Sequence, residues 1–289
     1  MPLLKVIILA IVQGLAELLP VSSSAHVVVA EKLLGLDPSS PPMTLLLVML
    51  HTGTMLAVIA YFWPQWRATY FQSASAFRSF AVLVVVATAC TAVVGFGLVK
   101  LIERTVLHAV PHAEIEDLFS HLEFIAPALA AVGVLIVIAG LYERRPSERV
   151  PAGAGELNIR RAGLIGAVQG LCLPFRGFSR SGATISTGLL LGVAKSRAEA
   201  FSFALAVVLT PPVVAREVMR LVRFVHASGA GGLGSAALVS VLGALVALVA
   251  GLLALRWLSR WLEGGRWYLF GIYCLVAAAV VGLLHRAGY

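Results

Sequence analysis

The chain has 289 residues, of which 60% are hydrophobic and only 12% are charged, and its mean hydropathy is +0.94. Because soluble domains carry roughly a quarter of charged residues, this composition excludes an ordinary water-soluble fold and indicates an integral membrane protein. The formal net charge is +8. The basic residues stand at the ends of apolar segments, so we expect membrane lipid headgroups, and no nucleic acid, as their partners.

The first apolar stretch, residues 5–35, is interrupted near its middle by LLPVSSSAH at 18–26. Each half has about 12 to 15 residues, fewer than the roughly 20 that a helix needs to cross the hydrocarbon core. The pattern predicts a re-entrant segment, in which one helix enters the membrane, the chain breaks, and a second helix returns. Such a break is tolerated at membrane depth only where protein buries it or where it lines a wet cavity.

Uninterrupted apolar runs lie on both sides of a second broken stretch at 161–195, where CLPFRGFSRSGAT occupies 172–184. The polar connection before it, residues 142–161, holds five arginines, and the positive-inside rule predicts that it is cytoplasmic. Because lipid cannot satisfy backbone polar groups, the uninterrupted runs are predicted as helices. The expected fold is an all-α polytopic membrane protein with two re-entrant helix-loop-helix segments and about six transmembrane helices, at 43–63, 80–101, 123–142, 199–222, 236–256 and 267–285.

The two broken stretches resemble each other. AIVQGLAELLPVSSSAH at 10–26 and GAVQGLCLPFRGFSRSGAT at 166–184 share V-Q-G-L, a break that contains proline, and a closing S-x-S before a small residue. Interrupted hydrophobic segments in corresponding halves indicate an inverted repeat with its site at the interface between the repeats. We therefore expect a single membrane domain over 1–289, with intertwined pseudo-repeats at about 1–142 and 160–289.

An ionisable residue inside a broken stretch is informative, because a charge at the bilayer centre costs about 2.5 to 3.5 kcal/mol on insertion scales. Glu17 is such a residue, and Gln13 lies four positions before it, so a helix places both side chains on one face. We predict Glu17 as a catalytic residue and the candidate metal ligand, and Gln13 as a substrate-binding residue. The structural alternatives are a salt bridge from Glu17 to a buried arginine and an interhelical hydrogen bond from Gln13.

Three serines, Ser22, Ser23 and Ser24, follow Pro20 and precede an apolar helix. A helix cap explains one of them, and the amide groups at such a helix start also attract an anion. We predict Ser23 as a catalytic residue and the other two serines as substrate-binding residues. His26 comes two residues later as a candidate acid, base or nucleophile, with a satisfied polar residue at a helix end as the alternative.

In the second break, Arg180 stands among small residues and carries a forked cation suited to phosphate oxygens. We therefore predict it as a catalytic, anion-binding residue rather than an anchor at the membrane surface. Gly177 permits close approach of the backbone to a ligand. His51 opens HTGTMLAV and either reaches the site or only packs. The remaining substrate-binding candidates are Arg176, Ser179, Ser181 and Thr184.

A carboxylate, an imidazole, hydroxyls and an arginine near two helix starts fit phosphoryl chemistry. Three nucleophiles stay open: Ser23, His26 and an activated water. We favour attack by Ser23, with His26 or Glu17 as the base and Arg180 holding phosphate oxygens. A magnesium or calcium ion would need oxygens from substrate phosphates and water in addition to the carboxylate of Glu17. Three scattered cysteines in apolar sequence are predicted as small apolar residues without a disulfide or zinc site, Cys90, Cys172 and Cys274.

VQGLAELLPVSSSAH and GFSRSGATISTGLLLG closely resemble the two signature motifs of the bacterial undecaprenyl pyrophosphate phosphatase family, the bacitracin-resistance type. The likeness extends through HTGTMLAVIAYFW and EAFSFALAV and covers most of the chain. Gln13 and Glu17 match the family's pattern of Glu or Gln, three residues, then Glu. The second motif, Pro-Gly-x-Ser-Arg-Ser, is matched from Gly177 to Ser181, but Arg176 stands where Pro is usual.

This resemblance implies hydrolysis of a C55 polyprenyl diphosphate lipid to its monophosphate, which recycles the lipid carrier for cell-wall synthesis. It also implies residence in the bacterial inner membrane, an active site that opens to the periplasmic or outer side, inverted repeats, re-entrant helices and a divalent cation, Mg²⁺ or Ca²⁺. The expected partners are the polyprenyl diphosphate, membrane lipids and a second copy in a homodimer.

Three alternative functions differ from this one in the sequence features they require. A transporter or flippase of a phosphorylated polyprenyl lipid also uses broken helices at a repeat interface. A second lipid phosphatase family requires a histidine six residues after the motif arginine, where this chain has Ser186. An intramembrane serine protease requires Gly-x-Ser-Gly, which GFSRSG does not supply.

Overall fold

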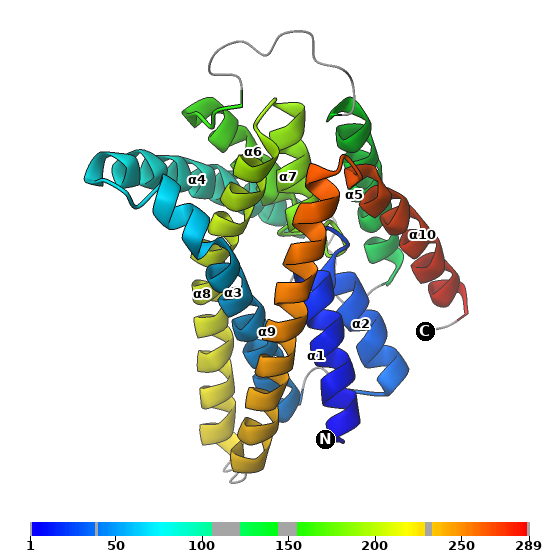
Figure 1. The fold of residues 1–289 in the computed structure, drawn as a ribbon. Coiled ribbons are helices and arrows are strands. Elements are labelled where there is room, and N and C mark those ends of the chain that lie inside the picture. The colour runs from blue at the N-terminus through cyan, green and yellow to red at the C-terminus, as the bar shows by residue number, and fades with distance from the viewer. Residues whose placement is uncertain (1, 38–39, 106–121, 144–154, 229–232, 288–289) are drawn as a thin grey trace.

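The computed structural model describes residues 2–37, 40–105, 122–143, 155–228 and 233–287. In this part of the chain the regular elements are helices, and strand pairing is limited to one bridge between Gly155 and Val193 (Figure 1). The prediction of an all-α fold is confirmed. In chain order the helices are α1 (Leu3–Leu18), α2 (Ser23–Leu34), α3 (Pro41–Thr69), α4 (Ala74–Thr105), α5 (Leu122–Glu143), α6 (Ile159–Leu171), α7 (Arg180–Leu190), α8 (Lys195–Ser228), α9 (Leu233–Glu263) and α10 (Trp267–Arg286).

Among the described residues, six helices are long and apolar enough to cross a membrane: α3, α4, α5, α8, α9 and α10. Each contains one of the six predicted spans, so that prediction is confirmed. The helices are longer than the apolar runs; α4, for example, begins at Ala74, although its apolar run begins at Phe80. The polar residues at its start, such as Ser75 and Arg78, end the apolar run without ending the helix.

The first broken stretch forms a hairpin of two short helices, α1 and α2. Lys5 Nζ, near the start of α1, donates to the Leu34 carbonyl at the end of α2 over 2.5 Å. The helices are therefore antiparallel, and the chain returns to the end of the molecule from which it started (Figure 1). At about 1.5 Å per residue, α1 with 16 residues and α2 with 12 are both shorter than the roughly 30 Å hydrocarbon core.

The second broken stretch forms a matching hairpin of α6 and α7. The backbone amide of Ala194, after α7, donates to the carbonyl of Gly155, before α6, over 3.1 Å. This hairpin lies toward the end of the molecule opposite to the N-terminus (Figure 1). The chain breaks predicted at 18–26 and 172–184 are thus confirmed, and the two hairpins approach the centre from opposite ends.

Glycines let each hairpin pack tightly against the other half of the chain. A Cβ added at Gly14 of α1 would lie 2.6 Å from the Ala250 Cβ of α9, and one at Gly170 of α6 would lie 2.8 Å from the Val94 Cβ of α4. Real Cβ atoms do not approach so closely, so only glycine permits these helix pairs. Because α1 rests on α9 and α6 rests on α4, the two halves are interlocked around the hairpin tips.

Candidate active site

The tips of the two hairpins are in direct contact. Ser24 Oγ accepts a hydrogen bond from the Gly177 amide over 3.2 Å, and Ser181 Oγ donates to the Leu19 carbonyl over 3.4 Å. Between the tips lies a cavity of about 270 Å³. Its polar lining is formed by Glu17, Ser22, Ser23, Ser24, His51, Arg176, Ser179, Arg180 and Ser181, and its apolar lining includes Cys172, Leu173, Phe175 and Phe178.

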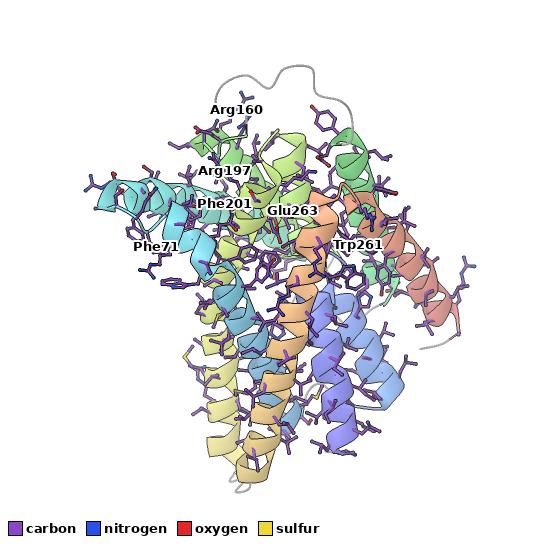
Figure 2. The ribbon with its side chains drawn as sticks, viewed as in Figure 1. Phe71, Arg160, Arg197, Phe201, Trp261 and Glu263 are labelled. Atoms are coloured by element: carbon purple, nitrogen blue, oxygen red, sulfur yellow. The ribbon has the colours of Figure 1, made fainter. Side chains whose placement is uncertain are left out.

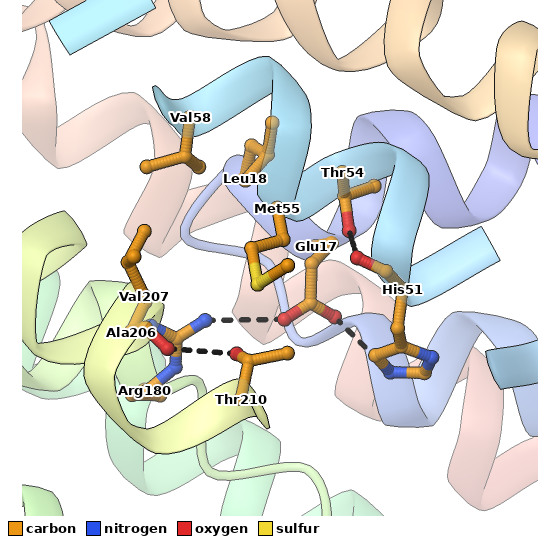
Figure 3. A pocket seen from close by; sticks show the side chains of 10 residues that line it. All are labelled: Glu17, Leu18, His51, Thr54, Met55, Val58, Arg180, Ala206, Val207 and Thr210. Carbon is orange, nitrogen blue, oxygen red and sulfur yellow. Dashed lines mark hydrogen bonds and ion pairs between the residues drawn. The ribbon is translucent and has the colours of Figure 1, made fainter. Parts of the chain in front are cut away.

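Glu17 is the centre of the polar contacts at this cavity (Figure 3). Its Oε1 accepts from Arg180 Nη2 over 3.1 Å, and its Oε2 accepts from Gln13 Nε2 over 3.1 Å. His51 Nε2 lies 3.8 Å from Oε2, and Ser23 lines the cavity together with this carboxylate. The predicted common face of Gln13 and Glu17 is confirmed, and Gln13 reaches the cavity only through this carboxylate.

Arg180 is the first residue of α7, and its helix is capped by Ser179, whose Oγ accepts from the Gly182 amide over 3.2 Å. One guanidinium nitrogen, Nη2, contacts Glu17, while the other, Nη1, is buried and has no hydrogen-bond partner. A buried polar group without a partner costs about 1 to 3 kcal/mol, and more if it is charged. Because Arg180 also lines the cavity, its guanidinium offers a cationic partner to an anion bound there.

The serines of the first tip form the start of α2. Ser22 is its N-cap, and its Oγ accepts from the Ala25 amide over 3.5 Å and lies 3.2 Å from Ser24 Oγ. Ser23 and Ser24 are the first two helical residues, so their amide groups precede the first hydrogen bonds inside the helix. Together with the start of α7, this gives the cavity two helix N-termini, each of which favours negative charge.

Four predicted site residues lie outside the cavity lining. Gln13 contacts Glu17 through the hydrogen bond described above. Gly177 has a φ of 99°, and its backbone passes so close to Ile125 that a Cβ would lie 2.5 Å from the Ile125 carbonyl oxygen. Thr184 is fully buried, and its hydroxyl contacts the Arg180 carbonyl at 2.8 Å and Ser202 Oγ at 2.6 Å. Thr184 therefore shapes α7 and faces α8 instead of the cavity.

His26 is the fourth residue outside the cavity lining. Its Nδ1 is 2.8 Å from the Ser22 carbonyl oxygen, and its Nε2 is 2.7 Å from the hydroxyl of Tyr273 on α10. Both ring nitrogens thus have protein partners. The position of this imidazole was not predictable from the motif, because Tyr273 lies 247 residues away in an apolar span where a tyrosine is ordinary.

Two lining residues were left open or missed by the sequence analysis. His51, for which packing and site roles were both open, lines the cavity and faces Glu17. Cys172, predicted as a small apolar residue, is free and also lines the cavity. The HTGTM sequence was the available signal for His51. The apolar sequence around Cys172 gave no signal that it lines a cavity.

A smaller cavity of about 20 Å³ lies on the other side of the Glu17–Arg180 pair (Figure 3). His51 also borders it, and the rest of its lining comes mainly from apolar side chains of α3 and α8, including Met55, Val58 and Val207. The ion pair therefore stands between a polar cavity at the hairpin tips and an apolar space between two long helices.

The side chains that line the cavity decide whether a divalent cation can be held there. Within the described residues no group of three His, Cys, Asp or Glu side chains converges on one point. Glu17 is the acidic residue in the cavity lining, beside serine hydroxyls. These residues fit a magnesium or calcium ion only if substrate phosphates and water complete its shell, which is the usual way in which proteins hold magnesium.

Comparisons with known proteins agree with the motifs. The model of the family described as bacitracin resistance protein BacA matches residues 6–280. The chain is 56% identical over 284 residues to undecaprenyl-diphosphatase 2 of Acinetobacter baylyi, with 97% of each chain covered. It is 33% identical over 288 residues to undecaprenyl-diphosphatase 1 of Burkholderia pseudomallei, with 96% of this chain and 95% of the relative covered. The chain belongs to the bacitracin resistance protein BacA family.

Proposed function

We propose that this protein is an undecaprenyl-diphosphatase, which hydrolyses undecaprenyl diphosphate to undecaprenyl phosphate and inorganic phosphate and so recycles the lipid carrier for cell-wall synthesis. The observation that carries the proposal is the Arg180 guanidinium, which lines the cavity and is held by Glu17 through Nη2. A guanidinium binds phosphate oxygens through charge-assisted hydrogen bonds.

The surroundings of Arg180 fit an amphipathic diphosphate. The starts of α2 and α7 present amide groups to the 270 Å³ cavity, where the phosphates would lie. The apolar side chains of α3 and α8 beside the ion pair, among them Met55 and Val58, would contact the prenyl chain where it joins the diphosphate. The names and identities of the relatives support the same substrate class.

The shared position of Ser23, Glu17 and Arg180 in the lining of one cavity supports attack by the serine. Ser23 Oγ forms a bond to the terminal phosphorus as its proton passes to Glu17, and the bond from that phosphorus to the bridging oxygen breaks. The electron pair leaves with undecaprenyl phosphate. Water then attacks the phosphoserine, releases inorganic phosphate and restores the Ser23 hydroxyl. Arg180 and the amides at the two helix starts hold the phosphate oxygens throughout.

A divalent cation, Mg²⁺ or Ca²⁺, belongs to the proposal as an expected cofactor. Glu17 would be its protein ligand, and the ion would neutralise part of the diphosphate charge when bound. Phosphate release measured after treatment with a chelator, and again after addition of each metal, tests this. We expect activity to fall with the chelator and to return with the metal; activity that ignores the chelator contradicts it.

The direct test is phosphate release from undecaprenyl diphosphate by purified protein in detergent. Release is expected, whereas a flippase would move the lipid without releasing phosphate. A rapid acid quench followed by mass mapping then locates any phosphoenzyme. Phosphate on Ser23 supports the order given above, and acid-labile phosphate on His26 reverses it. If neither forms and Ser23→Ala still turns over, an activated water is the nucleophile.

We further propose that the protein lies in the bacterial inner membrane with α1–α2 and α6–α7 as re-entrant hairpins of an inverted repeat. Arg160 and Arg197 lie at the end of the molecule from which α6 enters and to which α7 returns (Figure 2). In the sequence, the connection that leads into α6 is rich in arginine. The positive-inside rule makes that end cytoplasmic. Single cysteines at Lys5 and Arg160, probed with an impermeant thiol reagent in intact cells, should label only at Lys5. The opposite pattern would invert the orientation, and a homodimer stays a separate prediction for cross-linking.

A further inference from the structure

Side chains outside the loop between α1 and α2 hold it by hydrogen bonds to its carbonyl groups. Cys274 Sγ, on α10, lies 3.3 Å from the Pro20 carbonyl oxygen, to which it donates. The next residue back on α10, Tyr273, reaches the loop through His26, whose Nδ1 bonds the Ser22 carbonyl. One helix from the far end of the chain therefore holds the loop that carries Ser23.

The loop needs such support because Ser22 has a strained backbone. Its φ is 68° and its ψ is 94°, and it is the one non-glycine residue with a positive φ in the part of the chain that the structure describes. A Cβ makes this region of backbone conformation unfavourable, and it persists only when surrounding contacts enforce it. The turn at Ser22 directs Ser23 and the first amides of α2 to the cavity.

The hydrogen bonds of His26 define what its ring does. A carbonyl oxygen can only accept, so Nδ1 must carry a proton and donate to Ser22. In the neutral ring Nε2 then accepts from the Tyr273 hydroxyl, 2.7 Å away, and the two rings are stacked with centroids 5.6 Å apart. The carbonyl of Ser22 thus selects the tautomer, and the tyrosine hydroxyl, as donor to Nε2, is compatible with it.

We infer that Tyr273 and His26 are positioning residues, which hold Ser22 in its left-handed conformation by a chain of hydrogen bonds from α10 and so aim Ser23 at the phosphorus. The inference rests on the proposed phosphatase function. It gives His26 a role through the backbone of Ser22, in place of one as acid, base or nucleophile. Neither ring nitrogen has to reach the substrate for the imidazole to matter.

Substitutions at His26 separate the two nitrogens. The side-chain amide nitrogen of asparagine occupies the place of Nδ1, whereas that of glutamine occupies the place of Nε2. We expect His26→Asn to keep kcat within about threefold of wild type, because it retains a donor for the Ser22 carbonyl. His26→Gln and His26→Ala should each lower kcat about ten- to a hundredfold with little change in KM, the range expected for releasing a strained turn.

Relief of the strain provides a second, independent measurement. Glycine adopts the Ser22 conformation without a steric penalty and replaces a serine cap at little cost. Relative to Ser22→Gly alone, the added change His26→Ala should then cost less than about fivefold, far below its cost in the wild-type background. If the imidazole transferred protons or phosphate, His26→Ala would lower kcat by the same factor in both backgrounds.

The tautomer can be measured without any activity. In protein labelled with ¹⁵N-histidine, the His26 signals are assigned by their loss in His26→Asn, and we expect a protonated Nδ1 and an unprotonated Nε2. Tyr273→Phe keeps the stacked ring but should reduce that tautomer and lower kcat about two- to tenfold.

The inference is overturned if Nε2 carries the proton in the wild-type ring. It is also overturned if His26→Asn is as inactive as His26→Ala and Ser22→Gly brings no relief. If the wild-type protein releases no phosphate at all, the proposed function fails instead, and the nitrogen signals still decide whether Tyr273 and His26 form this chain.

Discussion

The two hairpins, α1–α2 and α6–α7, share a plan and differ in what they supply. Each begins with a helix that carries V-Q-G-L, and each has a tip where a serine caps the second helix, Ser22 in one and Ser179 in the other. The charges are divided between them: the first supplies the carboxylate of Glu17, and the second supplies the guanidinium of Arg180. A Leu at position 173 stands where the second V-Q-G-L repeat would place the equivalent of Glu17.

The hairpins also differ in backbone strain. The second turns at Gly177, which adopts its φ of 99° without a Cβ penalty, whereas the first turns at Ser22, which needs His26 to hold it. In our proposal the unstrained hairpin, α6–α7, supplies Arg180 to bind the phosphate, and the strained hairpin, α1–α2, supplies the nucleophile Ser23. The comparison shows how two similar sequences, placed tip to tip, make one asymmetric site.

The largest effects are expected at the ion pair between the two hairpins. Glu17→Gln and Arg180→Ala should each lower kcat by about 10² to 10³, because each removes one half of the electrostatic pair at the cavity. The measurement is phosphate release at saturating substrate. Glu103→Gln, a carboxylate of α4 outside the cavity lining, is the matched control and should be near wild type. Near-normal activity in either test variant would take that residue out of the mechanism.

The next effect is a loss of stability when the helix contacts of each hairpin are disturbed. Gly14→Ala and Gly170→Ala should each destabilise the protein by about 1 to 3 kcal/mol, because the new methyl group collides with α9 or with α4. The measurement is the temperature at which half of the purified protein loses its monodisperse peak. Gly97→Ala, where a Cβ meets nothing within 4 Å, is the control and should be neutral or stabilising. Equal behaviour of all three variants would refute the close packing.

The two glutamines of V-Q-G-L offer a finer comparison. Gln13 Nε2 donates to Glu17, whereas Gln169 Nε2 donates to Thr91 Oγ1 on α4 over 3.0 Å. Gln13→Ala should therefore lower kcat by about three- to tenfold. Gln13→Glu should be tolerated, because the family pattern accepts Glu or Gln at this position. Gln169→Ala should lower thermal stability and leave kcat unchanged. A Gln13→Ala variant as inactive as Glu17→Gln would mean that the amide itself acts on the substrate.

The smallest effect is expected at the departure from the family motif. Arg176→Pro restores the usual residue at a position that lines the cavity. We expect KM for the diphosphate to rise by about two- to fivefold with kcat unchanged, because a cation at the rim adds binding to substrate and transition state alike. Steady-state kinetics at several substrate concentrations measure this. A fall in kcat instead would show that Arg176 helps to shape the turn at Gly177.

Much of this architecture could be predicted because its signals are local. Apolar runs gave the spans, proline and serine clusters gave the breaks, and helical spacing placed Gln13 beside Glu17. The contact between the hairpin tips was foreseen from their likeness to each other. The orientation of His26 was not, because its partner Tyr273 is distant in sequence, and hydropathy does not register a hydroxyl in an apolar helix. The place of Thr184 was missed for a related reason: its partner Ser202 lies on another helix.

The support that α10 gives to the first loop has a consequence for biosynthesis. Ser22 and Ser23 leave the ribosome early, but the side chains that hold their loop, Tyr273 and Cys274, are made some 250 residues later. The nascent chain must therefore insert its first hairpin without the contacts that fix it. Translation through Cys274 is therefore needed before the loop next to Ser23 gains all the contacts that hold it.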